Sequence, residues 1–339
     1  MKIGNFLERA QYVIIANALL TLLPSSVVAQ ETQPAPGLPC AEVVHVELLG
    51  GDIRQGALRV LEVRLNEPVD DLQVTWATQA LHFWPDKADP MRHFALVAAD
   101  LALDPNLGRI NISAVRASGD RFVCTRSVDV TLGEFKMVHA RVDRLRVNQR
   151  FVELDEKDVE RSKHESKLMQ EIFATVTTER YWTGIFHPPL RTMQPRGNFG
   201  RRRVFNGEPR APHTGEDLRA SLGTSVYAPQ SGKVVLAKNL FFAGNTVIVD
   251  HGLGLYTFFA HLSAFSVKEG DLVKIGQRLG RVGATGRVTG AHLHWSARLG
   301  NSRFDPLQLL DLKMPEVAQP QKSNGTEAID SSESPEART

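Results

Sequence analysis

Two histidines separated by one residue, His292 and His294, lie in a Gly- and Thr-rich stretch of this 339-residue chain. Alternate side chains of an extended backbone share a face, so both imidazoles would point one way and Leu293 and Trp295 the other. Two imidazoles on one face suggest a metal site or a proton-transfer site. A short His-x-His pair can also be a solvated strand pair, so the interpretation depends on partners elsewhere in the chain.

Partners of suitable chemistry occur in two other segments. The stretch PHTGED places His213 four residues before Asp217, and the proline and glycine beside them disfavour a regular helix. Residues 256–261 read as a strand that ends in His261. Zinc held by two histidines and one aspartate keeps a fourth position for water, which is how catalytic zinc sites are built. Two further histidines could take a proton and stabilise an oxyanion, so the set indicates a zinc hydrolase.

Five segments, spread in order over roughly residues 198–310, resemble the lysostaphin/LytM family of zinc metallopeptidases. They are PHTGEDLRA, GTSVYAPQSGKVVLA, GNTVIVDHGLGLYTFFAHLS, VKEGDLVKIGQRLGRVGATGRVTGAHLHW and RFDPLQLL. The resemblance implies a β-sheet groove fold whose members cleave peptide bonds of bacterial peptidoglycan. It also implies that His213, Asp217 and His294 bind Zn²⁺, and that His261 and His292 flank the reacting water as base and transition-state stabiliser.

Two positions need comment beside this resemblance. The family usually has an aliphatic residue before the motif aspartate, where this chain has Glu216. Alternation in an extended segment predicts that Glu216 faces away from the metal and is solvated or paired, for example with Arg219; the alternative is that it competes as a ligand. Asn198 lies where family members often carry an aspartate or asparagine, and we assign it no role. His251 lies in an expected hairpin turn, where a structural role is favoured.

The first part of the chain reads as an export segment. Residues 1–29 have the pattern of a secretory signal, with Lys2 and Arg9 before an apolar run and a small-residue cleavage site ending at Ala29. An uncleaved anchor is the alternative. Residues 30–40 are a Pro-rich spacer. In an exported protein the two cysteines, Cys40 and Cys124, predict a single disulfide.

The rest of the chain predicts a mainly β protein of two domains. Short β segments with turn signals over residues 41–147 indicate an immunoglobulin-like β-sandwich. Residues 148–184 form a helical connector, in which Asp155 can cap an amphipathic helix. Residues 185–312 form the zinc metallopeptidase domain, a LytM-type antiparallel β-sheet groove. Residues 313–339 are too polar to bury a core and are expected to be disordered.

The charge balance and the expected export limit the kinds of partner that this protein can have. Lys plus Arg number 40 against 38 Asp plus Glu, a balance that argues against a nucleic-acid partner. We expect a periplasmic or secreted protein of the cell envelope, with no membrane span in the mature form. Its expected substrate is the stem peptides or cross-links of peptidoglycan, and the first domain could bind an envelope protein.

Two other functions are open at this point. Some members of the family have lost zinc ligands and instead bind and activate cell-wall amidases. This chain retains all five expected groups, which argues against such an inactive regulator. The stretch VYAPQSGKVV also resembles half of a biotinyl or lipoyl carrier domain. That class needs a lysine at a hairpin tip, whereas Lys233 is expected within a strand.

Overall fold

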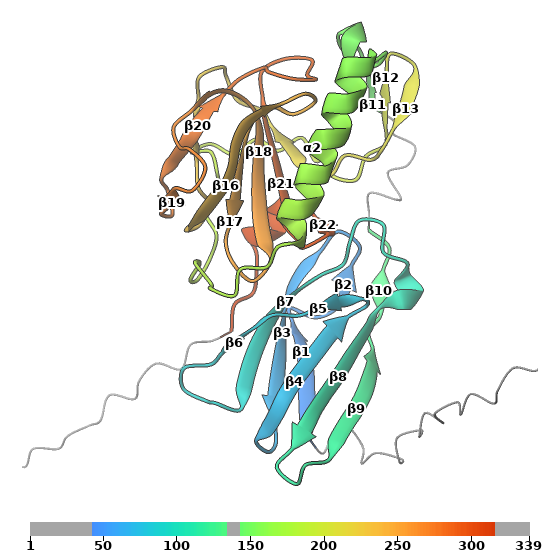
Figure 1. The fold of residues 1–339 in the computed structure, drawn as a ribbon, viewed down its shortest axis with the longest axis vertical. Coiled ribbons are helices and arrows are strands. Elements are labelled where there is room, and N and C mark those ends of the chain that lie inside the picture. The colour runs from blue at the N-terminus through green and yellow to red at the C-terminus, as the bar shows by residue number, and fades with distance from the viewer. Residues whose placement is uncertain (1–42, 134–142, 316–339) are drawn as a thin grey trace, which may run out of the picture. The chain divides into compact units, whose positions relative to one another are not determined.

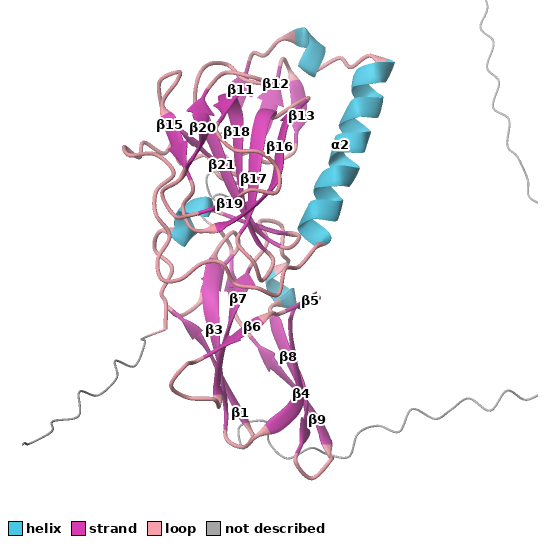
Figure 2. Ribbon diagram, turned by 60° about the vertical axis from the view of Figure 1, so that its left-hand side comes forward, coloured by secondary structure: helices cyan, strands magenta, loops and turns pink. Residues whose placement is uncertain are grey.

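The structure is a computed structural model that describes residues 43–133 and 143–315. The predicted signal and spacer, and all but the first three residues of the predicted tail, lie outside these ranges. Within them the protein is mainly β with a single α-helix, as the sequence predicts (Figure 2). No helix of the described residues is long and apolar enough to cross a membrane.

The first domain consists of two four-stranded antiparallel sheets, with strand orders β1-β3-β7-β6 and β5-β4-β8-β9. Buried residues alternate along β8 at Ile110, Ile112 and Ala114, and the two isoleucines belong to a core that residues of both sheets fill. The immunoglobulin-like assignment of this domain stays a prediction. Cys124 is disulfide-bonded, and its expected partner Cys40 lies outside the described residues. The strands are β1 (Val44–Leu49), β2 (Ile53–Arg54), β3 (Leu58–Leu65), β4 (Val69–Trp76), β5 (Gln79–Ala80), β6 (Phe83–Pro85), β7 (Arg92–Ala98), β8 (Arg109–Arg116), β9 (Arg121–Ser127) and β10 (Val130–Thr131).

A connecting segment follows, and it packs on the second domain. Strand β11 (Asp143–Leu145) pairs in parallel with β12 (Arg203–Phe205), which pairs with β13 (Glu208–Arg210). Helix α2 (Glu156–Ala174) begins where the Asp155 side chain accepts a hydrogen bond from the Asp158 backbone N–H, at 2.7 Å. The pairing of β11 with β12 therefore ties the connector to the second domain.

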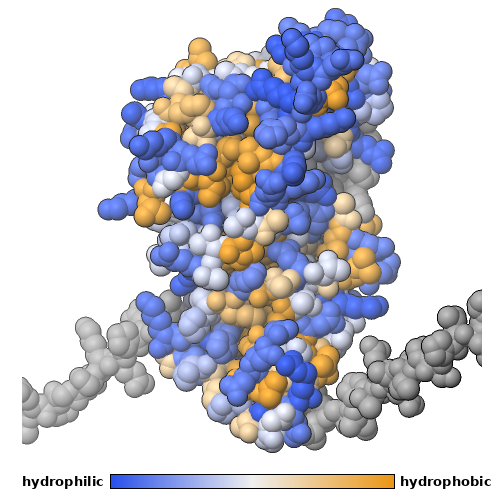
Figure 3. All heavy atoms as spheres, viewed as in Figure 1, coloured by the Kyte–Doolittle hydropathy of each residue, from blue (hydrophilic) through white to orange (hydrophobic). Residues whose placement is uncertain are grey.

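Helix α2 lies beside strands β16–β18 in both ribbon views (Figures 1 and 2). Its apolar residues Leu168, Met169, Ile172 and Phe173 pack on that sheet. The space-filling view shows hydrophilic side chains along the helix and hydrophobic ones beside it over the strands (Figure 3). The amphipathic helix that the sequence predicts thus covers one face of the second domain.

The second domain is built on a nine-stranded sheet whose main path runs β14-β21-β18-β17-β16-β19. Strand β18 lies at its centre between β17 and β21, and all of its pairings are antiparallel. Its buried apolar side chains pack with those of β17 and β21 in one core cluster, which also includes buried residues of β3 and β7. The strands are β14 (Glu216–Leu218), β15 (Ser225–Tyr227), β16 (Gly232–Leu240), β17 (Gly244–Asp250), β18 (Leu255–Phe265), β19 (Leu272–Val273), β20 (Arg278–Val282), β21 (Leu293–Leu299) and β22 (Ser302–Phe304).

Candidate metal centre

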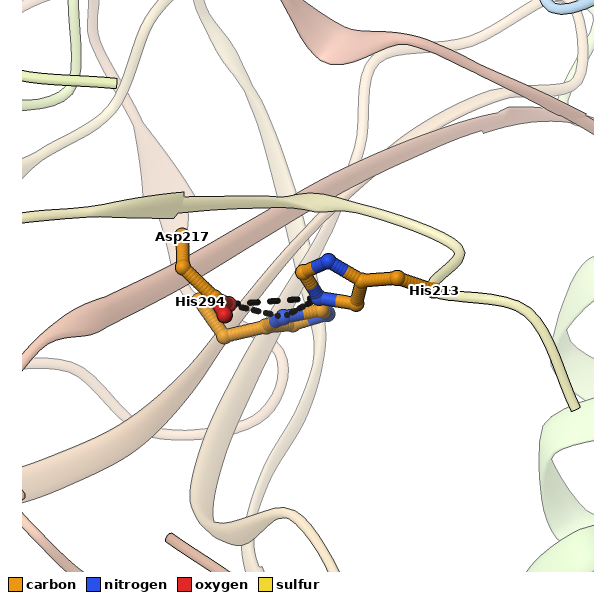
Figure 4. Close-up of side chains that lie close together, drawn as sticks. All are labelled: His213, Asp217 and His294. Carbon is orange, nitrogen blue, oxygen red and sulfur yellow. Dashed lines mark hydrogen bonds and ion pairs between the residues drawn. The ribbon is translucent and has the colours of Figure 1, made fainter. Parts of the chain in front are cut away.

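Three side chains from two neighbouring strands and the loop before them converge on one point. Strands β14 and β21 pair antiparallel with Asp217 directly opposite His294. His213 lies on the loop that leads into β14, and the three side chains point toward one another (Figure 4). His213 therefore lies in a loop and Asp217 in the strand that follows it, and not on one helix, as Pro212 and Gly215 predict.

The donor atoms of these residues are close enough to share a metal ion. His213 Nε2 lies 2.8 Å from His294 Nδ1, and Asp217 Oδ1 lies 2.9 Å from His294 Nδ1 and 3.2 Å from His213 Nε2. Zinc–nitrogen bonds of about 2.0–2.1 Å in a tetrahedron would separate two ligand atoms by roughly 3.3 Å. The three atoms therefore fit a zinc ion with small adjustments.

The protonation states also suit a metal. Burial lowers the pKa of His213 to about 3 and lowers the pKa of His294, so both rings are neutral at neutral pH. Burial alone would raise the pKa of Asp217, but the surrounding histidines, His213 foremost, hold that pKa well below its usual range. Two neutral imidazoles and one carboxylate are the donor set of a catalytic zinc site.

Backbone carbonyls orient the imidazoles. A carbonyl oxygen only accepts, so the ring nitrogen facing it must carry the proton. His213 Nδ1 donates to the Asn198 carbonyl at 3.1 Å, His261 Nδ1 to that of Thr285 at 2.8 Å, and His292 Nδ1 to that of Gly290 at 2.8 Å. In the neutral form of each ring the lone pair is therefore on Nε2.

His261 and His292 lie beside the three converging residues. Their ring centroids are 4.9 Å apart, and the His261 ring is 5.9 Å from that of His294. His261 has a φ of 63°, a strained conformation for a residue with a side chain, at an irregularity in the pairing of β18. The structure thus brings all five predicted site residues together, and His261 needs a strained backbone to be there.

Asn198 and Arg203 are further functional candidates, whose roles are not apparent from the sequence. The buried Asn198 donates from Nδ2 to Asp217 Oδ2 at 2.8 Å, and its Oδ1 accepts the backbone N–H of Asp217 at 3.0 Å. Arg203 Nη2 lies 3.3 Å from the same Oδ2. Both hold the outer oxygen of Asp217 and leave Oδ1 to the histidines. Only the family-typical position of Asn198 gave a signal for this.

Glu216 lies outside the converging donor set, as predicted, but its predicted surroundings are wrong. Its side chain is neither solvated nor paired with Arg219 but fully buried, and it accepts the backbone N–H groups of Gly197 at 2.6 Å, Asn198 at 2.9 Å and Phe199 at 3.2 Å. Three amides compensate a carboxylate that is removed from water, although burial still raises its pKa. Glu216 therefore anchors the loop that carries Asn198, and it is not part of the converging donor set among the described residues.

Two adjoining cavities give access to these residues. One of about 540 Å³ is lined by His213, His261 and His294, and one of about 270 Å³ by His261, His292 and Asp217. The first also has aromatic walls, from both the connector and the second domain: Phe151, Phe173, Phe205, Phe242 and Phe258. An extended chain could reach the candidate metal centre through them.

Comparison with known proteins agrees with this geometry. The sequence model of Peptidase family M23 matches residues 211–306, which contain all five of the site residues. These residues form a peptidase M23 domain. The predicted relationship to the lysostaphin/LytM-type peptidases is thereby confirmed.

Relatives of the M23 domain include cell-wall enzymes. Over 99 residues the chain is 46% identical to "Peptidoglycan DD-endopeptidase ShyA" of Vibrio cholerae, which covers 29% of this chain and 23% of the relative. Over 111 residues it is 41% identical to "DD-carboxypeptidase/endopeptidase Mpg" of Neisseria meningitidis, covering 33% and 25%. The chain thus spans about a quarter of the length of these curated relatives.

A solved structure resembles the chain outside the M23 domain as well. A Pseudomonas aeruginosa protein assigned to peptidase M23 matches with a TM-score of 0.55 and 26% identity, covering 79% of this chain and 92% of that one. The likeness extends over most of the described residues and supports the mainly β fold.

Proposed function

We propose that this chain is an exported, zinc-dependent endopeptidase that hydrolyses peptide bonds of peptidoglycan. The observation that carries the proposal is the convergence of two imidazoles and one carboxylate beside His261 and His292, each of which is oriented by a contact of its Nδ1 with a backbone carbonyl. The names of the M23 relatives support peptidoglycan as the substrate. The predicted signal supports a place in the periplasm or outside the cell.

Each residue then has a defined task. His213 Nε2, His294 Nδ1 and Asp217 Oδ1 would hold the zinc ion, and Asn198 and Arg203 fix the carboxylate that completes the set. When bound, zinc supplies a Lewis acid for the scissile carbonyl and lowers the pKa of water. His261 and His292 divide the remaining work, since one neutral imidazole accepts the proton and the other donates a hydrogen bond to the developing oxyanion.

The geometry disfavours the two other functions raised by the sequence. An inactive regulator has no need for three tautomers aligned by backbone carbonyls around one point. Lys233 lies within β16, opposite Asp250 of β17, and not at a hairpin tip where a carrier domain holds its cofactor.

Digestion of purified muropeptides, followed by product masses, tests the proposal. The zinc-loaded mature chain is expected to release peptides with new amino termini, a chelator to stop the release, and added zinc to restore it. His164→Ala, at an exposed position of α2, is the matched control and should leave the rate unchanged. Undiminished release by His294→Ala would overturn the proposal.

A further inference from the structure

A strongly basic cavity adjoins the candidate metal centre. The cavity of about 270 Å³ is lined by His261, His292 and Asp217, so it opens onto the residues proposed to carry out hydrolysis. Against the two carboxylates of Asp143 and Asp217, its described lining includes five guanidinium groups, those of Arg196, Arg201, Arg203, Arg219 and Arg287. The adjoining larger cavity has no acidic residue in its described lining.

The guanidinium groups of this cavity are only partly matched by acceptors. Arg287 is sandwiched between the rings of Phe205 and Phe242, at 4.5 and 4.4 Å from their centroids, and no carboxylate of the described residues forms an ion pair with it. The Nε atoms of Arg201 and Arg203 are buried and, in the described part of the chain, have no hydrogen-bond partner. Burying cations and N–H donors without acceptors is costly, so this cavity favours an anion.

One carboxylate already enters the cavity from the connector. The parallel pairing of β11 with β12 places Asp143 opposite Arg203, and Asp143 Oδ1 lies 3.6 Å from Arg201 Nη1. That distance is an ion pair but too long for a hydrogen bond. Asp143 is held by a strand of three residues. It is therefore a loosely bound occupant that a better-fitting carboxylate could replace.

We propose that this cavity binds a free carboxylate of the substrate and that Asp143 stands in its place in the unliganded protein. Planar guanidinium groups bind carboxylates through paired hydrogen bonds, which gives orientation as well as affinity. Because His261 and His292 line the same cavity, the bound carboxylate belongs to a residue next to the scissile bond. The inference rests on the proposed function, and it narrows the substrate class to acidic peptides.

Two synthetic stem-type peptides test this, identical except that the residue beside the scissile bond carries a free carboxylate or a carboxamide. Calorimetric titration of the metal-free, full-length mature chain excludes direct binding of the carboxylate to zinc. The free acid is expected to bind about tenfold or more tightly than the amide, as for a charge-assisted contact. Arg201→Gln and Arg287→Gln should lose most of this preference. Arg278→Gln, exposed on β20 and outside the cavity lining, should retain it.

Asp143→Asn gives a second test with almost no change of shape. Removing the resident carboxylate is expected to strengthen binding of the free acid several-fold and to leave binding of the amide unchanged. Equal binding of both peptides, by the wild-type chain and by Asp143→Asn, would overturn the inference.

Cleavage separates the inference from the proposed function. If the zinc-loaded chain cleaves both peptides with equal kcat/KM and binds them equally, the carboxylate site is refuted and the proposed function stands. If the free acid binds preferentially and neither peptide is cleaved, the proposed function fails and the carboxylate site is supported.

Discussion

Two buried histidine environments in the same β domain differ in what surrounds the ring nitrogens. His251, between β17 and β18, is fully buried, and its Nδ1 lies 2.8 Å from the carbonyl of Ser231 and its Nε2 2.8 Å from the hydroxyl of Thr257. At the candidate metal centre, Nδ1 of His213, His261 and His292 each contacts a backbone carbonyl, and among the described residues no carbonyl or hydroxyl group binds the other ring nitrogen. The rings are buried in both environments, but only at the candidate metal centre does a ring nitrogen remain available to bind a metal or a substrate.

The hydrogen-bond partners of the two ring nitrogens distinguish a structural histidine from a reactive one better than burial or the pKa does. Burial lowers the pKa of His251 to about 4 and that of His261 to about 3, so both rings are neutral. A ring with both nitrogens satisfied by the protein has nothing left to offer a metal or a substrate. A ring with one nitrogen satisfied is oriented and still able to react.

The largest expected effect comes from removing a proposed ligand. His213→Ala or Asp217→Ala should lose stoichiometric zinc and lower hydrolysis by about a thousandfold or more, because residues that act as one unit fail together. Zinc content by atomic absorption and muropeptide release measure the two effects. His251→Ala is the matched control, since its ring is equally buried. If it loses zinc to the same extent, the distinction between the two environments is wrong.

The next effect separates metal binding from proton transfer within the site. His292→Ala should retain zinc, because its Nε2 lies 3.6 Å from Asp217 Oδ1 and it is not one of the three converging donors. Its hydrolysis should still fall by about 10²–10⁴, the range for loss of an acid–base group. Zinc loss in this variant would instead make His292 a ligand or a support of one.

The sequence predicted the members of the site but not what holds them in place. The shared face of His292 and His294 could be predicted from the alternation of side chains along a strand. The non-helical segment that carries His213 and Asp217 could be predicted from the proline and glycine within it. Both are local properties of the sequence. Glu216 was misjudged because its partners, the amides of residues 197–199, are far away in the sequence and carry no side-chain signal. The same holds for β11, whose three residues pair with a strand about 60 positions later.

Loss of the Glu216 carboxylate should have an intermediate effect. Glu216→Ala leaves three backbone N–H groups without their acceptor, which should cost on the order of 1–3 kcal/mol of unfolding free energy or more. Because the loop carries Asn198, which orients Asp217, zinc affinity should also fall by about 10–100-fold. Chelator competition measures the affinity, and urea unfolding measures the stability. Glu208→Ala, exposed on β13, should change neither. Unchanged zinc affinity in a destabilised Glu216→Ala would limit this residue to a structural role.

The smallest expected effect concerns His251 alone and appears only in acid. A histidine whose pKa is about 4 when folded and about 6.5 when unfolded excludes a proton that the unfolded chain binds. Its contribution to stability is therefore complete above pH 6.5 and is lost as the pH falls from 6.5 toward 4, by about 1–3 kcal/mol in total. His251→Asn removes this titration, so its unfolding free energy in urea should fall less steeply between pH 6.5 and 4.5 than that of the wild type. Zinc content at pH 7 should stay the same, because no ligand contacts this ring among the described residues. Parallel acid profiles for the two proteins would show that His251 is not the buried neutral group that its two hydrogen bonds imply.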